Sequence, residues 1–241
     1  MSIILSHLTL ILFWLISIVH ANTEKTIFLG PPAVNIPSAH PTLDDLHVDV
    51  LTPTNSAIRT HLNAQFPNVT WPHGKATWLI LDDLVQGQRY EVRVCWAATQ
   101  PTAFKINTYD LETVFETPEL ISELSGYSWS RQSPEIEDGS RSKPAKSIQA
   151  ASSERQASVL FLQILTAADY YTMDKALMKH VPPVYVDIIL DPFVLNVLPR
   201  SLLPTVGYIV VVSIMSWFVA RSIGTWIRVI AAEPSSEKKM Q

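Results

Sequence analysis

Cysteine is almost absent from this 241-residue chain, and glycine is scarce. Cys95 is the only cysteine, and there are seven glycines. A single cysteine excludes an intrachain disulfide and a zinc cluster built from several thiolates. We expect Cys95 to be a small buried hydrophobe, with a cross-link to a partner as the alternative. The few glycines form no phosphate-binding loop of the Gly-rich kind.

Charge is also low, and the usual catalytic patterns are missing. Charged residues make up 17% of the chain, and the formal net charge is -4. The basic residues form no stripe that could neutralise a run of phosphates, so we expect no nucleic-acid partner. There is no His-Glu-x-x-His motif and no Gly-x-Ser-x-Gly nucleophile elbow. The acidic pairs Asp44-Asp45 and Asp82-Asp83 lack the Asp-x-Asp spacing with which metal-dependent glycosyltransferases hold a nucleotide diphosphate. We therefore expect no catalytic residue, metal site or cofactor.

Hydrophobic residues are abundant, at 47% of the chain, and two apolar runs lie near its ends. The first run, residues 3–19, predicts a signal peptide over residues 1–21, because Val19 and Ala21 suit the cleavage positions. A basic segment before the run is missing, so an uncleaved anchor is the alternative. The second run, residues 201–220, is uncharged and predicts a transmembrane helix, since about 20 residues cross a hydrocarbon core of about 30 Å.

Basic residues follow the second run more densely than they precede it, so the positive-inside rule places residues 221–241 in the cytosol. The chain is then a single-pass type I membrane protein with residues 22–200 in the lumen. Lys238 and Lys239 have the spacing of a dilysine signal read by coat proteins, which predicts retrieval to the endoplasmic reticulum. Asn68 begins the one N-glycosylation sequon, on the side predicted to be lumenal.

The lumenal part has the pattern of strands. Tyr90, Val92, Val94 and Trp96 alternate with polar neighbours, which predicts a strand with one buried face. Further strands are expected at residues 26–29, 46–51, 77–81, 103–109, 158–165 and 184–190. About seven strands, and a Leu-x-x-Gly-x-x-Tyr segment at 84–90 that resembles the tyrosine corner of fibronectin type III domains, predict a mainly β, immunoglobulin/fibronectin-like sandwich.

Two segments of the lumenal part depart from the strand pattern. Residues 128–157 are polar with almost no aliphatic side chains, so we expect a disordered insertion. Residues 167–180 mix apolar and polar positions at helical spacing, which predicts a short helix.

The membrane helix and the segment after it indicate a partner. Ser216, Ala220 and Gly224 recur every four residues, so one face of the helix would let another helix approach closely; a plain lipid-facing helix is the alternative. Beyond the span, apolar residues separate from polar ones, which predicts an amphipathic continuation on the membrane surface or a tilted extension of the helix.

The junction before the helix is the most distinctive stretch. Its residues Asp191-Pro192-Phe193 and Leu198-Pro199-Arg200-Ser201-Leu202-Leu203-Pro204, together with the layout of the chain, resemble the fungal co-activator subunit of GPI mannosyltransferase II. The resemblance implies a noncatalytic partner of a multi-span, PIG-V type mannosyltransferase in the endoplasmic-reticulum membrane. The partner-binding candidates in the junction are Asp191, Pro192, Phe193, Asn196, Pro199, Arg200 and Pro204; the alternative is a rigid stalk without specific contacts.

Other functions remain open at the level of sequence. One is a PIG-X type subunit that stabilises the enzyme adding the first mannose. Another is a cargo receptor or lectin-like adaptor, which exposed aromatic clusters on a sheet edge would favour. A third is an enzyme without a known motif.

The dilysine interpretation predicts a change of location. Replacing Lys238 and Lys239 with serine should let the protein reach later secretory compartments, which cell fractionation measures. Glu237→Ser is the control, because it changes the charge of the same tail and keeps both lysines. Retention of the double variant in the endoplasmic reticulum would contradict the interpretation.

Overall fold

The structure is a computed structural model that describes residues 21–37, 42–132 and 155–232. It consists of two units, Met1–Pro192 and Phe193–Gln241. The predicted signal peptide, apart from Ala21, and the predicted retrieval lysines lie outside the described residues.

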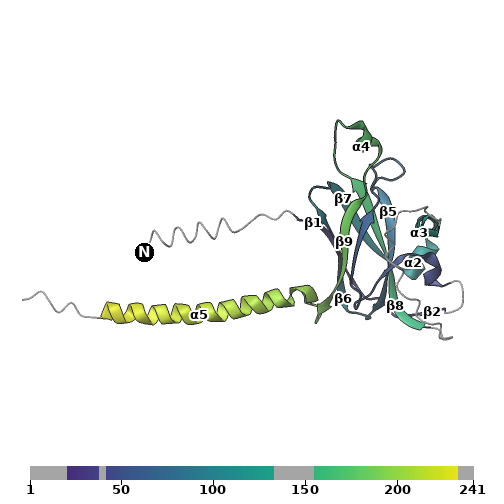
Figure 1. The fold of residues 1–241 in the computed structure, drawn as a ribbon. Coiled ribbons are helices and arrows are strands. Elements are labelled where there is room, and N and C mark those ends of the chain that lie inside the picture. Colours follow the sequence, from purple (N-terminus) through teal and green to yellow (C-terminus); the bar gives the residue numbers. More distant parts are fainter. Residues whose placement is uncertain (1–20, 38–41, 133–154, 233–241) are drawn as a thin grey trace, which may run out of the picture. The chain divides into compact units, whose positions relative to one another are not determined.

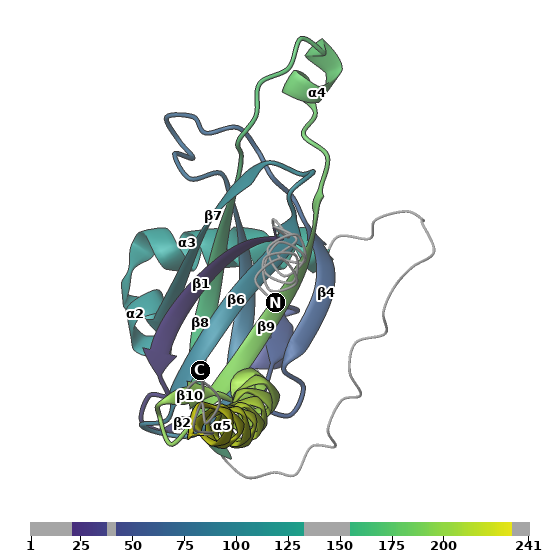
Figure 2. The same cartoon turned by 90° about the vertical axis from the view of Figure 1, so that its left-hand side faces the viewer.

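The first unit is built on two sheets (Figures 1 and 2). The first sheet has the order β1-β6-β9, with β4 also paired to β9. Its strands are β1 (Ala21–Leu29), β4 (Ala57–Leu62), β6 (Arg89–Ala97) and β9 (Val184–Val194). These pairs are antiparallel.

The second sheet has the order β2-β8-β5-β3, with β7 paired to β8. Its strands are β2 (Val34–Ile36), β3 (Asp49–Leu51), β5 (Lys75–Leu84), β7 (Thr102–Asp110) and β8 (Arg155–Ala168). The pair β3 and β5 is parallel, whereas the others are antiparallel. The helical elements of this unit are η1 (Leu43–Leu46), α2 (Leu111–Glu116), α3 (Pro118–Gln132) and α4 (Lys175–Lys179).

One core fills the space between the two sheets. Tyr90, Val92 and Val94 of β6 are fully buried in it, as their alternation predicts. Ile188 and Leu190 of β9 belong to the same core and face leucines of β5 and β8. Sequence and structure agree here because, in a strand with one solvated face, apolar and polar residues alternate along the sequence with a period of two.

A second core lies on the other face of the second sheet, under α2 and α3, which Figure 1 shows beside β5 and β8. Trp78 of β5 and Phe161 of β8 are fully buried there, with Val114 of α2 and Leu124 of α3. Burying each such side chain contributes about 1.5–3 kcal/mol. Strands β5 and β8 are thus buried on both faces, which explains their nearly continuous apolar sequences.

A tyrosine corner is present at Tyr90. Its hydroxyl group accepts a hydrogen bond from the Val85 backbone N–H at 2.9 Å and donates one to Gln88 Oε1 at 3.0 Å. Burial raises the pKa of Tyr90, so the hydroxyl remains protonated. The immunoglobulin/fibronectin-like sandwich as a whole is not confirmed, because the parallel pair β3–β5 and the helical layer depart from that architecture. The structure shows a β-rich fold of two sheets with a long apolar C-terminal helix.

The predicted insertion 128–157 is wrong at both ends. Residues up to Gln132 belong to α3, and residues from Arg155 belong to β8; residues 133–154 lie outside the described part. The Arg131 guanidinium holds the end of α3 by donating to the His47 carbonyl at 2.7 Å and to Asp49 Oδ1 at 3.1 Å. The polar composition of residues 128–157 predicted disorder, because composition does not reveal hydrogen bonds to residues far away in the sequence.

Three other expectations need correction. The predicted helix 167–180 shrinks to Lys175–Lys179, since β8 runs to Ala168 and the Asp174 side chain caps α4 by accepting from the Ala176 N–H at 2.8 Å. The predicted strand 46–51 is a strand only from Asp49 onward. Cys95 is only partly buried, and its Sγ accepts a hydrogen bond from Thr23 Oγ1 at 3.6 Å.

Two glycines with positive φ provide a test of the packing against β8. A Cβ at Gly74 (φ 81°) would lie 2.0 Å from the Thr166 carbonyl oxygen, whereas a Cβ at Gly87 (φ 73°) would meet nothing within 4 Å. Gly87→Ala should cost about 1–2 kcal/mol for the left-handed backbone alone. Gly74→Ala should cost more, because overpacking adds about 1–3 kcal/mol. Thermal unfolding of the detergent-solubilised protein measures the difference, and equal losses would contradict the close approach.

Candidate membrane and partner interface

The second unit is dominated by one apolar helix. Helix α5 (Leu203–Ala232) follows the 3₁₀ turn η2 (Arg200–Leu202) without a break. Among the described residues, Arg200–Ala231 is the stretch long and apolar enough to cross a membrane, and none of its hydrophobic window is buried inside the structure. Thirty residues at about 1.5 Å each give about 45 Å, which exceeds a hydrocarbon core of about 30 Å. The predicted boundary at residue 220 therefore lies inside a continuous helix.

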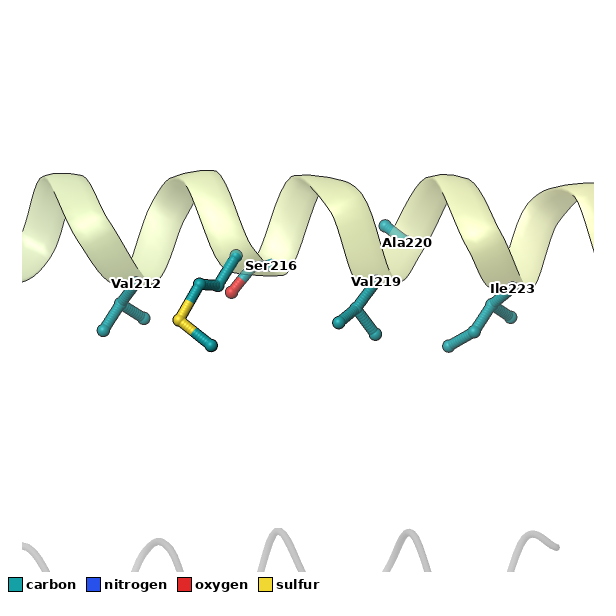
Figure 3. Close-up of a pocket in the computed structure, with 6 residues that line it drawn as sticks. Val212, Ser216, Val219, Ala220 and Ile223 are labelled. Atoms are coloured by element: carbon teal, nitrogen blue, oxygen red, sulfur yellow. The ribbon is translucent and has the colours of Figure 1, made fainter.

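A shallow groove runs along one face of α5 (Figure 3). Figure 3 shows Val212, Val219 and Ile223 on one side of the helix, with the short Ser216 side chain between them. The groove is lined by Val212, Met215, Ser216, Val219, Ala220 and Ile223. Two of the three small residues predicted from the sequence thus line the groove, and the third, Gly224, lies beyond its lining.

The cytosolic end predicted for the span carries an arginine held on the helix surface. The Arg221 guanidinium carbon lies 5.6 Å from the centre of the Trp217 ring, one turn earlier. This cation–π contact keeps the charged group beside an aromatic ring of the kind that favours membrane interfaces. The segment after Arg221 remains helical, with Ile223, Trp226, Ile227 and Ile230 exposed.

The junction before α5 forms a hairpin. Short strand β10 (Leu198–Pro199) pairs antiparallel with Val194 and Phe193 of β9. The Val197 N–H closes the turn by donating to the Val194 carbonyl at 3.1 Å. Leu195 and Asn196 at its centre have φ of 53° and 58°, the left-handed pair typical of a type I′ turn.

The turn places an unusual residue in the left-handed region. Asparagine tolerates this backbone conformation, whereas leucine pays about 1–2 kcal/mol for it. Leu195 is also 91% exposed, and Val197 is 78% exposed. This hairpin is not predicted by the sequence, because Leu-Asn is not a recognised turn pair. The neighbouring prolines are the only local signal of a turn.

The other junction candidates are distributed over several elements. Asp191 and Pro192 lie in β9, where they pair with Glu91 and Tyr90 of β6. Phe193 is 6% exposed at the end of the same strand. Arg200 begins η2, and Pro204 lies in the first turn of α5, where a missing N–H costs nothing.

Asp191 belongs to a cluster of ion pairs on the outer face of the first sheet. Its Oδ2 lies 3.4 Å from Arg93 Nη2, and Arg93 Nη1 lies 3.6 Å from Glu91 Oε1. Lys25 Nζ contacts the other Glu91 oxygen at 3.0 Å. The Glu91 and Asp191 side chains are each 5% exposed, so removing one partner would leave a buried charge. Asp191 therefore stabilises the sheet, whatever else it contacts.

A second ion pair on this sheet joins β4 to β9. Arg59 donates to both carboxylate oxygens of Asp187, at 2.6 and 2.9 Å. These hydrogen bonds lower the pKa of the Asp187 carboxyl below its usual value, so the pair stays ionised at neutral pH. Both side chains are solvent-accessible, so the pair links strands with little effect on stability.

The titratable groups of the described residues form no reaction centre. No three His, Cys, Asp or Glu side chains in this part of the chain could hold a metal ion. Burial raises the pKa of Glu123, but its carboxylate accepts a hydrogen bond from Gln163 Nε2 under α3 and so joins α3 to β8. A cavity of about 310 Å³ at the Val184 end of β9 is lined by Pro101, Tyr170, Leu177 and other mainly apolar residues. That lining offers no acid–base pair.

A comparison with protein-family models identifies the family of this chain. A family model described as GPI-Mannosyltransferase II co-activator, Pga1, matches residues 12–223. The chain belongs to the Pga1 family. No curated protein and no solved structure matches.

Membership of the Pga1 family confirms the resemblance drawn from the junction. The Pga1 match covers both sheets, the hairpin and most of α5. The chain is thus a co-activator in GPI-anchor biosynthesis and a noncatalytic subunit of the mannosyltransferase complex. The match to the Pga1 family model favours none of the three alternatives, namely a PIG-X type subunit, a cargo receptor and an independent enzyme.

Asn68, the first residue of the N-glycosylation sequon, is accessible enough to carry a glycan. It is exposed in a turn, where its Oδ1 accepts hydrogen bonds from the Thr70 and Trp71 N–H groups at 2.9 and 2.7 Å. This Asx turn engages the oxygen and leaves the amide nitrogen, the atom that would carry the glycan, outside these bonds.

Occupancy of Asn68 is testable on a gel. The protein from its native membrane should shift to lower mass after glycosidase treatment, and Asn68→Gln should migrate like the treated protein. Thr70→Ser is the control, because it keeps the sequon. A shift that persists in Asn68→Gln would contradict glycosylation at this position, and an unshifted wild type would contradict a glycosylated lumenal site.

Proposed function

We propose that this chain supports a multi-span, PIG-V type enzyme in transferring the second mannose to the glycosylphosphatidylinositol precursor. The observation that carries the proposal is the match to the GPI mannosyltransferase II co-activator model over most of the chain. The catalytic residues then lie in the partner. The chain's own contribution is to bind that partner and hold it in an active form at the membrane.

The proposed topology places residues 22–200 in the lumen and the C-terminal tail in the cytosol. The continuous apolar helix α5 supports a single span of the endoplasmic-reticulum membrane. The arginines Arg221 and Arg228 after the uncharged stretch support the orientation. Coat proteins that read Lys238 and Lys239 would keep the subunit in the compartment where the precursor is assembled.

The groove of α5 is the proposed contact with a helix of the enzyme. Lipid tails are as apolar as the helix surface, so helices associate in membranes through close packing more than through the hydrophobic effect. Ser216 and Ala220 are the small side chains of the groove lining, so a second backbone could approach closely beside the row formed by Val212, Val219 and Ile223. Gly224 extends the small face by one further turn.

The junction is the proposed second contact. Phe193, Asn196, Pro199, Arg200 and Pro204 follow one another through the hairpin, η2 and the first turn of α5. Asp191 and Pro192 precede them in β9. Because hydrogen-bonded elements hold these residues, they can present a defined surface to the enzyme at the lumenal end of the span.

Filling the groove should weaken the complex. The double variant Ser216→Leu, Ala220→Leu is expected to lose most of the enzyme that co-purifies with the wild type in mild detergent, because the leucines occupy the space of the second helix. The matched control is Val211→Leu, Ser222→Leu, which enlarges two side chains outside the groove lining.

The same variants test the function in cells. Loss of the chain, and the groove variant, should both accumulate a precursor carrying one mannose, whereas the control variant should not. Accumulation of a mannose-free precursor would assign the subunit to the first mannosyltransferase. An intact complex in the groove variant would remove the groove from the interface.

A further inference from the structure

The exposed tip of the β9–β10 hairpin carries aliphatic side chains that have no packing function in the described structure. Leu195 is 91% exposed and Val197 is 78% exposed, although both are aliphatic. Their neighbour Val194 is partly exposed at 38%. A soluble β-turn usually has polar residues or glycine at such positions. The tip is therefore suited to an apolar surface outside the chain.

The left-handed backbone conformation at the tip is energetically unfavourable for Leu195. Leu195 has φ 53° at the first central position of the turn, where Asn or Gly would fit without strain. The Val197 N–H bond to the Val194 carbonyl and the pairing of Leu198 with Val194 hold it in this conformation. Strained residues that the surroundings enforce cluster at functional sites such as active sites, ligand clamps and switch regions.

The position of the tip along the chain restricts what can cover it. Arg200 and Arg221 bracket the uncharged stretch, so Arg200 lies at the lumenal surface of the bilayer if α5 spans it. Val197 lies three positions before Arg200, which keeps their Cα atoms within about 11 Å of each other. The headgroup layer on one side of a bilayer is about 5–8 Å thick. The tip therefore remains close to this layer for any orientation of the first unit.

We propose that Leu195 and Val197 insert into the lumenal headgroup layer, so that the hairpin is a second membrane contact beside α5. The ligand is the lipid surface itself, without a requirement for a particular headgroup. The contact rests on the proposed membrane span. It would limit rotation and tilting of the lumenal sheets, because a span alone leaves them joined to the membrane through one short segment.

The test places an environment-sensitive fluorophore at single cysteines of the full-length protein in phosphatidylcholine vesicles. Cys95→Ser removes the native thiol, and the label is attached in turn to Leu195→Cys, Val210→Cys in the middle of the span, and Met173→Cys in the loop before α4, where the side chain is 85% exposed. We expect a blue-shifted emission at positions 195 and 210 and a water-like emission at position 173. Lipids with a quencher near the headgroup should quench position 195 more than lipids with a deep quencher, and position 210 should show the reverse.

The three positions separate the possible failures. Water-like emission at 195 with an apolar environment at 210 overturns the inference and leaves the span intact. Water-like emission at both positions overturns the span and the inference with it. Emission at 195 that shifts only when the mannosyltransferase is added identifies a protein contact and also overturns the inference.

A substitution that preserves the turn gives a second readout. With the label at Val197→Cys, Leu195→Asn should reduce the blue shift, because it removes the apolar side chain while fitting the left-handed backbone better than leucine does. Leu195→Met keeps an apolar side chain and should retain the shift. An unchanged shift in Leu195→Asn would contradict insertion of Leu195.

Discussion

Burial of the β5–β8 strand pair on both faces is the constraint on which the rest of the two-sheet unit depends. One face of the pair packs against β6 and β9, and the other packs under α2 and α3. Trp78 and Phe161 meet edge to face in the second core, with ring centres 6.2 Å apart. Two layers must therefore cover the same pair, and the remaining strands and helices are arranged to do so. At the start of β5, Gly74 lies so close to the neighbouring strand β8 that a Cβ would be 2.0 Å from the Thr166 carbonyl oxygen.

The sequence revealed the strands whose residues alternate or form long apolar runs, and it missed the elements that depend on distant contacts. Strands β6 and β9 were predictable because one face is apolar and the other is polar. Strands β2 and β4 were missed, because β2 has three residues and β4 has few buried ones. Helix α3 was missed because only Leu124 and Ser128 are buried along its 15 residues, and contacts from His47 and Asp49 hold its end.

The candidate interface was partly accessible to the same reasoning. Ser216 and Ala220 were predicted from their spacing, since an exposed helix shows its small face directly in the sequence. The hairpin was not predicted, because a left-handed leucine has no sequence signal. Membership of the co-activator family makes both features relevant to one task. A subunit without a reaction centre of its own can act by fixing the position of another protein, and the helix groove and the junction are the two contacts that we propose for this.

The place of β9 in the first sheet has a consequence for biosynthesis. β9 is paired on both sides, with β6 and β4, and yet it is the last long strand made before the membrane helix. Among the described strands β4 pairs with β9 alone, so at about 5–20 residues per second it has no partner strand for on the order of 10 s after its synthesis. During that time β6 also lacks its neighbour β9 on one side of the sheet, although β1 and the apolar residues of β5 are already available to it. Because α5 begins nine residues after β9 ends, completion of the first sheet and synthesis of the candidate membrane helix are nearly simultaneous events.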